Sequence, residues 1–445
     1  MNYPERPTAK AARHGTARGL SCRSAVDVDT ARSVLSRLLL LATFVNLATF
    51  AQHPYTWQEL RDKFQAANPT IQAARLAVDE SRAAEITAYL RPNPGFTALL
   101  DQLAPFTANP YRPLTYTFPA VSLSYLHERQ NKRELRRTSA RGATAIAEST
   151  LADQERSLLF NLRSAFVQTL QAKSVLATTR ENLTYWDKVL RVSSDRLKAG
   201  DIAQIDLDRL ELQRIQFEAD VQTAEVNLRT AKIQLLMLLN ERTPVDSFDV
   251  NGPFDFPEQI PPLDDLRKIA LDNRPDLRAA LQTSEKAATD YKLAVSNGST
   301  DPILSVDFGR NPPIQVYMGV SVNIPLRIFD RNQGEKLRTE IDIRRAAQLT
   351  EATRAQVFSD VDSAYVQTTS SITLLKPYKA KYLQQAARVR EIVAFSYQRG
   401  AATLLDFLSA ENDYRSVQLN YLNLVGAYMT SAGQLNLAAG HEVLQ

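Results

Sequence analysis

The chain has 445 residues, only 14 of them glycine, a formal net charge of +4 and a single cysteine. This length allows two or three domains. Residues 1–37 carry seven basic and three acidic side chains, so they account for the whole net charge and the remainder is formally neutral. A nucleic-acid partner would require a basic face on that remainder, and the charge count gives it no support.

An uncharged, mostly apolar stretch at 38–50 follows Arg37 and ends in small residues before Gln52. A basic segment, a short apolar core and small residues at the end indicate a secretory signal peptide over residues 1–51, with a long basic region. A membrane anchor is the less favoured alternative, because it needs about 20 apolar residues. Cys22 precedes the apolar core, so the mature chain is expected to have no lipid-bearing cysteine, no disulfide and no thiolate metal site.

An internal repeat with a shift of about 200 residues organises the rest of the chain. The segment SAFVQT at 164–169 recurs as SAYVQT at 363–368, Gly200 recurs as Gly400, and Asp206 recurs as Asp406. Similar helical composition alone would not keep glycine and aspartate in step, so the repeat indicates a duplication. The predicted parts are repeat unit 1 at 52–240, a Pro-rich linker at 241–262, repeat unit 2 at 263–438 and a tail at 439–445.

Each repeat unit predicts the same elements in the same order. They are a short helix (56–68 and 263–273), a helix with Pro in its first turn (69–90 and 275–296), two strands (95–103 and 115–126; 303–309 and 315–324) and a long helical hairpin. We expect the linker to wrap around the middle of the helices.

The first long helix, at 128–198, has a coiled-coil spacing of apolar residues from Leu151 to Leu197. At 1.5 Å per residue it would be about 105 Å long, so it must pack along other long helices. Pro377 lies inside the second copy and has no counterpart in the first, which predicts a kink or break there.

The sharpest strand pattern is the alternation of apolar and small or polar residues at 316–324. One face carries apolar side chains and the other small or polar ones: Val316, Met318, Val320, Val322 and Ile324 against Gly319, Ser321 and Asn323. A tilted strand of about ten residues is long enough to cross a bilayer. We expect the apolar face to contact lipid and the other face to line a lumen.

Several of these features together resemble the TolC-type outer-membrane efflux proteins. They are the two-fold repeat, the strand-to-helix junction Asn323-Ile-Pro-Leu326 with Asn332-Gln-Gly334, and the hairpin Tyr397-Gln-Arg-Gly400 with Asp406-Phe-Leu408. The resemblance covers residues 55–440, and Arg91-Pro-Asn-Pro-Gly95 resembles the branch that includes heavy-metal efflux channels.

The resemblance implies a mainly α fold with a small β part, built from a duplicated helix–strand–strand–long helix–helix unit. Three copies of the chain would close a 12-stranded β-barrel that continues as a long α-helical barrel. The implied location is the outer membrane, extending into the periplasm. The implied partners are outer-membrane lipid, a periplasmic adaptor (membrane fusion) protein and an inner-membrane pump.

The turns of the two long hairpins are the candidate functional residues. Gly400 fits the end of a helix, and Thr403 with Asp406 fits a capping box, the interpretation that the residues alone favour. The resemblance adds a second role, in which three copies of Asp406 form an acidic ring that narrows the periplasmic mouth.

The resemblance also assigns the residues around this turn. It places Tyr397 at the gate, although an aromatic packing role is an equally good interpretation, and it implies that the companion tip with Gly200 and Asp206 meets the adaptor. It departs at Ala402 and Ser409, where the best-known family member has an arginine and an acid. A gate latch made by those two groups is therefore not carried over.

An enzyme is not expected, because the four histidines are scattered and the sequence has no phosphate loop, metal-ligand cluster or nucleophile signature. No cofactor or metal is expected either. The predicted function is a passive trimeric exit duct of a tripartite efflux pump or type I secretion system. The alternative is a periplasmic coiled-coil adaptor or structural protein outside the membrane, which would need one hairpin and no alternating strands.

Overall fold

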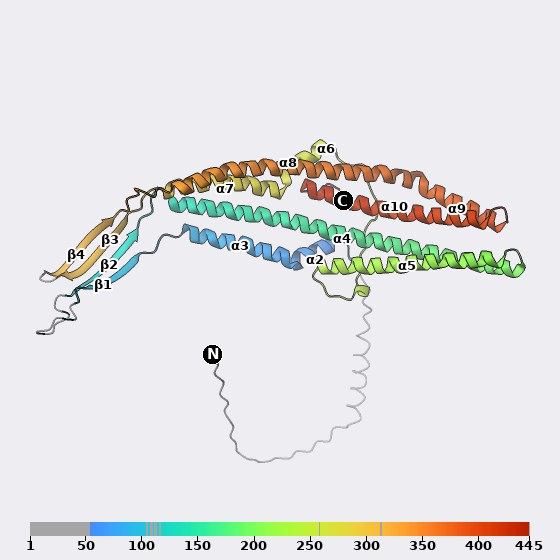
Figure 1. The fold of residues 1–445 in the computed structure, drawn as a ribbon, viewed down its shortest axis with the longest axis horizontal. Helices are drawn as coiled ribbons and strands as arrows, with labels where there is room; N and C mark the ends of the chain where they lie inside the picture. Colours follow the sequence, from blue (N-terminus) through green and yellow to red (C-terminus); the bar gives the residue numbers. More distant parts are fainter. Residues whose placement is uncertain are drawn as a thin grey trace, which may run out of the picture. The chain divides into compact units, whose positions relative to one another are not determined.

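The computed structural model describes residues 54–444, apart from gaps at 104–105, 107–109, 111–113, 115–116, 258 and 312–313. The predicted signal peptide and Cys22 lie outside the described residues. Pro54–Gln445 form one compact unit, and its described part is mainly helical with one small antiparallel sheet (Figure 1). The predicted class, mainly α with a small β part, is confirmed.

The elements follow the predicted order in both copies. The first copy consists of α2 (Trp57–Ala67), α3 (Pro69–Tyr89), β1 (Gly95–Asp101), β2 (Phe118–Leu126), α4 (Lys132–Ala199) and α5 (Gln204–Leu238). The second consists of α6 (Leu263–Asn273), α7 (Pro275–Asn297), β3 (Ile303–Asn311), β4 (Ile314–Asn323), α8 (Gln333–Pro377), a π-helical turn η2 (Tyr378–Tyr382), α9 (Leu383–Gln398) and α10 (Leu404–Ala439). A short 3₁₀ turn, η1 (Val245–Ser247), lies between the copies.

The helix ends show why the chain divides at these positions. Pro69 and Pro275 each occupy the first turn of a helix, where the missing N–H would have no partner anyway. The Asn68 side chain accepts hydrogen bonds from the N–H groups of Thr70 and Ile71 at 2.9 and 3.2 Å. The first long helix begins at Lys132 and not at 128 as predicted, because the two residues before it have left-handed backbones, with φ of 58° and 55°.

The break predicted at Pro377 is confirmed. Helix α8 ends at Pro377 and the chain continues through the π-helical turn into α9, whereas α4 runs for 68 residues without interruption. Proline lacks the N–H that a helix interior requires, and its ring meets the carbonyl of the preceding turn, so a wider turn accommodates it.

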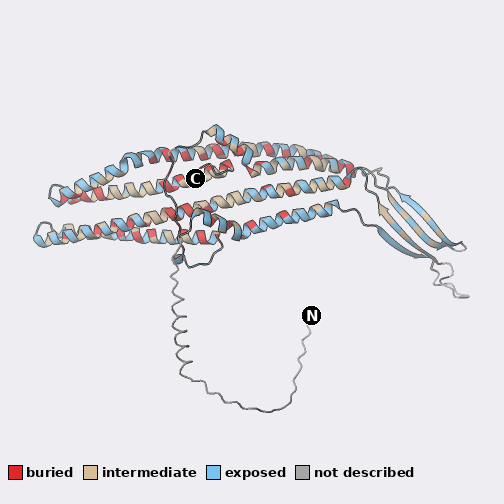
Figure 2. Ribbon diagram, turned by 180° about the vertical axis from the view of Figure 1, so that it is seen from behind, coloured by how far each residue is buried: buried red, intermediate tan, exposed pale blue. Residues whose placement is uncertain are grey.

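Helix α4, about 100 Å long at 1.5 Å per residue, packs along α3, α5, α7 and α10. Buried residues recur along the long helices (Figure 2). No residue of the predicted seam from Leu151 to Leu197 is exposed. The repeated segment shows the duplication at atomic detail, because Thr169 and Thr368 are both fully buried and both donate to the carbonyl four residues earlier at 2.8 Å.

The linker between the copies contacts both of them. It begins against the first copy, where Val250 forms a bridge with Tyr55. It ends against the second copy, where Asp255 pairs with Lys379 at 3.1 Å and Phe256 packs on Tyr428. The linker therefore ties the two hairpins together at their middle.

The four strands form an antiparallel sheet in the order β1-β2-β3-β4, so each copy contributes two neighbouring strands. One face carries an apolar row across all four strands, Phe96, Leu123, Val306 and Val320. The next row, on the opposite face, is Gly95, Ser124, Ser305 and Ser321. Strands β1 and β4 each have one neighbouring strand within the described residues.

Among the described residues, no helix combines the length and the apolar character needed to cross a membrane.

Candidate functional site at the helical tips

Two tight turns, one in each copy, join the long helices at the end opposite the sheet (Figure 1). Gly200 and Gly400 have left-handed backbones with φ of +82° and +74°. A Cβ on either residue would meet nothing within 4 Å, so the turn requires glycine for its backbone conformation and not for space. In each turn the residue after the glycine donates its N–H to a carbonyl of the preceding helix. Asp201 donates to Arg196, and Ala401 donates to Ser396.

Asp406 closes the first turn of α10. Its carboxylate accepts from the N–H and the hydroxyl of Thr403 at 3.0 and 2.7 Å, while the Thr403 hydroxyl accepts from the Asp406 N–H at 3.2 Å. The hydrogen bond from the Thr403 hydroxyl, followed by that from its N–H, lowers the pKa of Asp406. The predicted capping box is confirmed, and the side chain that forms it is both charged and exposed.

Asp206 has no such role, although it occupies the equivalent position in the first copy. The residue at the cap of α5 is Ala203, which has no side chain to offer, and the Asp206 carboxylate lies 4.0 Å from Arg209. A single difference, alanine for threonine, leaves this acid outside a capping box.

Four stacked aromatic rings connect the tips, and each ring comes from a different helix. Phe217 of α5 stacks on Trp186 of α4 at 4.9 Å, Trp186 on Phe407 of α10 at 6.0 Å, and Phe407 on Tyr397 of α9 at 5.0 Å. Trp186 is fully buried and donates to the Leu210 carbonyl at 3.0 Å. Heptad spacing along a single hairpin does not predict that Trp186, Phe217 and Phe407 join the two hairpins in one column.

Tyr397 lies at the junction of the two hairpins. The Arg196 guanidinium, from the other hairpin, lies 5.5 Å above its ring and donates to its carbonyl at 3.4 Å. Burial raises the pKa of Tyr397, and its hydroxyl has no hydrogen-bond partner among the described residues. An open groove of about 540 Å³ between the tips is lined by Tyr397, Gly200, Asp206 and Gly400. Asp406 does not line this groove.

A buried acid below the tips was not predicted from the sequence. Glu411 of α10 is 5% exposed and interacts with the Tyr185 phenol of α4. The Arg390 guanidinium of α9 lies over the rings of Tyr185 and Tyr414, at 4.6 and 4.0 Å. Burial raises the pKa of Glu411 to about 7, against the opposing effect of Arg390. Glu411 directly follows an apolar position of the heptad spacing. Helical periodicity places such a residue on the surface, so nothing in the sequence indicated that this acid is buried.

The predicted strand residues lie at the other end, on β4 except for Ile324, which directly follows it. The apolar set Val316, Met318, Val320, Val322 and Ile324 is 51–75% exposed in the single chain. Ser321 and Asn323 are also exposed, and Gly319 is half-buried. Within the described residues, no group of three His, Cys, Asp or Glu side chains is placed to hold a metal ion.

Long hairpins held side by side, with a glycine turn at one end and a sheet with one apolar face at the other, are the architecture expected of a membrane channel component. Comparison with known proteins supports this class. Residues 266–441 match the family described as outer membrane efflux protein. The cobalt-zinc-cadmium resistance protein CzcC of Cupriavidus metallidurans is 23% identical over 400 residues, which cover 88% of this chain and 91% of CzcC.

Solved outer-membrane channels share the fold. VceC of Vibrio cholerae superposes with a TM-score of 0.70 at 17% identity, covering 87% of this chain and 97% of VceC. The open state of MtrE of Neisseria gonorrhoeae gives a TM-score of 0.71 at 17% identity, covering 87% and 89%. The match of residues 266–441 to the outer membrane efflux protein family confirms the resemblance to TolC-type outer-membrane efflux proteins, and it supports the outer-membrane location and the role in efflux. Residues 266–441 are an outer membrane efflux protein domain.

Proposed function

We propose that this chain is the exit duct of a tripartite efflux or secretion system, through which solutes pass passively from a pump and its adaptor to the outside. The observation that carries the proposal is the continuity of two structures. A sheet of strands 7 to 10 residues long has an apolar face on all four strands, and it continues into helical hairpins about 100 Å long.

A homotrimer completes the sheet. In lipid, the open edges of β1 and β4 would leave backbone groups without hydrogen bonds, which a bilayer does not tolerate. Three copies of a four-stranded sheet make a closed 12-stranded barrel, an even number that such barrels favour. In that barrel Val320 and its row face lipid, and Ser321 with its row lines the lumen.

The helices carry a second set of apolar residues that supports the same assembly. On α5, Ile205, Leu212, Val226 and Ile233 are all more than half exposed and are separated by multiples of seven residues. This spacing is typical of a coiled-coil seam, and it differs from the seam that α5 already uses against α4. On the other hairpin, α9 exposes Val389, Ile392 and Phe395. Head-to-tail contact between these unlike faces closes a ring of protomers.

At the tips, three copies of Asp406 around the axis make an acidic constriction at the periplasmic mouth, with Tyr397 beside it. The companion tip, with Gly200 and Asp206, is the surface for the adaptor. The capped geometry of Asp406 supports the gate, because it holds an exposed carboxylate in a fixed position.

The test is the state of the mature chain after purification. In detergent we expect a trimer by light scattering, and in planar bilayers discrete conductance steps. A monomer that stays soluble without detergent and conducts no current contradicts the proposal and favours a periplasmic adaptor outside the membrane.

A further inference from the structure

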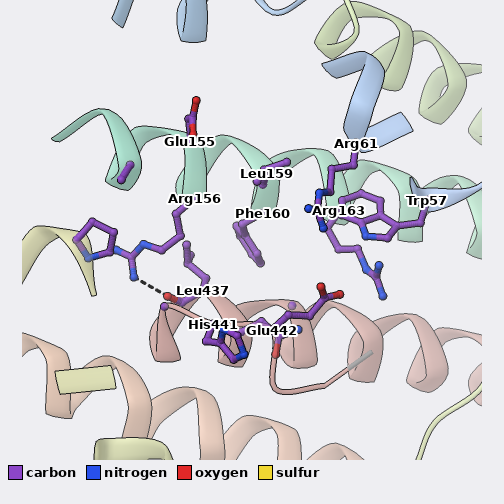
Figure 3. Close-up of a pocket in the computed structure, with 15 residues that line it drawn as sticks. Trp57, Arg61, Glu155, Arg156, Leu159, Phe160, Arg163, Leu437, His441 and Glu442 are labelled. Atoms are coloured by element: carbon purple, nitrogen blue, oxygen red, sulfur yellow. Dashed lines mark hydrogen bonds between the residues drawn. The ribbon is translucent and has the colours of Figure 1, made fainter. Parts of the chain in front are cut away.

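A pocket far from both the tips and the sheet lies between α2, α4 and the end of α10 (Figure 3). Its volume is about 320 Å³, and the C-terminal tail with His441 and Glu442 forms its lower wall in this view. This is the lower end of the size range of small-molecule sites. The exit-duct function has no use for it.

Three arginines line this pocket, and two of them have no ion-pair partner among the described residues. Arg156 is occupied, because it pairs with Asp153 at 2.5 Å and donates to the Leu437 carbonyl at 2.6 Å. Arg61 and Arg163 make no hydrogen bond or ion pair with any described residue, and the Arg61 Nε is buried. A buried N–H without a partner costs about 1–3 kcal/mol of stability. A ligand that accepts a hydrogen bond from this N–H would recover part of that free energy.

The acids at the pocket do not neutralise these groups. Glu155 is already paired with Arg75 at 3.1 Å. Glu442 is exposed on the tail, within electrostatic range of Arg163 but not in an ion pair with it. Burial lowers the pKa of Arg163, and Glu442 only partly opposes this effect. The pocket therefore has a surplus of positive charge in a partly desolvated position.

The remaining wall is apolar and aromatic. The Arg163 guanidinium lies over the Trp57 ring, 4.7 Å from its centroid, as a cation–π pair, and Leu159 and Phe160 also line the cavity. A guanidinium held flat on an indole keeps its N–H edges free for a carboxylate or phosphate.

We propose that this pocket binds a small ligand with an oxyanion group, carboxylate or phosphate, joined to an apolar ring. Arg61 and Arg163 hold the oxyanion, and Trp57 and Phe160 contact the ring. Glu442 competes for Arg163 at the pocket mouth. The site is independent of the channel, so it stands or falls separately from the exit-duct function.

Tryptophan fluorescence of the full trimer in detergent tests the site, with benzoate, phenyl phosphate and inorganic phosphate as probes and neutral benzamide as the control. The chain has two tryptophans, and Trp186 is fully buried in the aromatic column, so Trp57 reports on the pocket. We expect saturable changes with benzoate or phenyl phosphate, weaker binding of inorganic phosphate and none of benzamide. The relative affinities of benzoate and phenyl phosphate show whether the site prefers a carboxylate or a phosphate.

Variants separate binding from folding. Arg163→Gln and Arg61→Gln should each weaken binding by on the order of tenfold, because each removes a charge-assisted pair. Glu442→Gln should strengthen it a few-fold by removing the competing charge. Trp57→Phe should remove the fluorescence change while calorimetry still detects binding.

Three results overturn the proposal. They are equal responses to benzoate and benzamide, unchanged affinity in both arginine variants, and no saturable binding to the wild-type trimer. The last result would also be obtained if a neighbouring copy fills the pocket. Because Arg61 and Arg163 come from different helices, a folding defect in one variant leaves the other to decide.

Discussion

Asp406 caps a helix and is exposed to solvent at the same time. Its carboxylate closes the first turn of α10 through Thr403, yet it remains exposed and its pKa is lowered. Such a group stays ionised at any pH near neutrality, which an acidic ring at a pore mouth requires. The repeat predicted that Asp206 and Asp406 are equivalent in sequence, but it did not predict that Ala203 would leave one of them uncapped.

Asp406→Asn should weaken block of the reconstituted pore by Mg²⁺. Asparagine still accepts a hydrogen bond from Thr403, so the turn stays closed while three negative charges leave the constriction. We expect the half-blocking Mg²⁺ concentration to rise on the order of tenfold in single-channel recordings. Asp201→Asn is the matched control, since Asp201 is also exposed, on the other tip. Unchanged block and conductance in Asp406→Asn would remove this residue from the constriction.

At the scale of helices, the two hairpins of one chain are joined at the tips by a column of rings and, below it, by a buried acid. The rings of Phe217, Trp186, Phe407 and Tyr397 belong to four helices, and the stacked pair Trp186–Phe407 joins the two hairpins, so pulling the hairpins apart separates that pair. Glu411 lies in the same junction between α4, α9 and α10. Its ionisation therefore affects how firmly the hairpins hold together.

Glu411→Gln should stabilise the protein at pH 8 and have little effect at pH 4. The pKa of Glu411 is raised from 4.5 to about 7 by burial, so the folded state favours the protonated acid. That preference stabilises the fold below pH 4.5 and is lost as the pH rises through about 7. The gain at pH 8 should be up to about 3 kcal/mol per protomer.

Thermal unfolding of both proteins at pH 4 and pH 8 measures this difference. Glu391→Gln is the control, because Glu391 is exposed on α9 beside the same cluster. A wild type that is more stable than Glu411→Gln at pH 8 would mean that the ionised carboxylate is held by Arg390 more strongly than burial opposes it.

The sequence predicted the helices and strands well because the spacing of apolar residues and the positions of proline and glycine are local signals. Pro69, Pro275, Gly200 and Gly400 mark helix ends through their own backbones, and Pro377 marks the break through its missing N–H. Contacts between the hairpins are not local. The stacking of Trp186 on Phe407 and the burial of Glu411 depend on how two separate helix pairs meet, which heptad spacing within one pair does not determine.

At the scale of the whole molecule, the sheet register turns a one-strand pattern into a property of all four strands. The alternation at 316–324 predicted two faces for one strand only. The register extends it, because Val320 lies in one row across the sheet with Val306 and Leu123, and Ser321 lies in the next row with Ser305 and Ser124. Duplication thus supplies matching faces from both copies, and a closed barrel of three chains would have one apolar exterior and one polar lumen.

The adjacent residues Val320 and Ser321 give a direct test of that arrangement. Val320→Lys should prevent trimer assembly, because a lysine facing the middle of the bilayer costs about 2–4 kcal/mol in each copy. Ser321→Lys should leave the trimer yield unchanged and alter single-channel current, since its charge would enter the lumen. Each variant is the control for the other, with the same substitution one residue apart. Trimer loss in Ser321→Lys with normal assembly of Val320→Lys would reverse the two faces of the barrel.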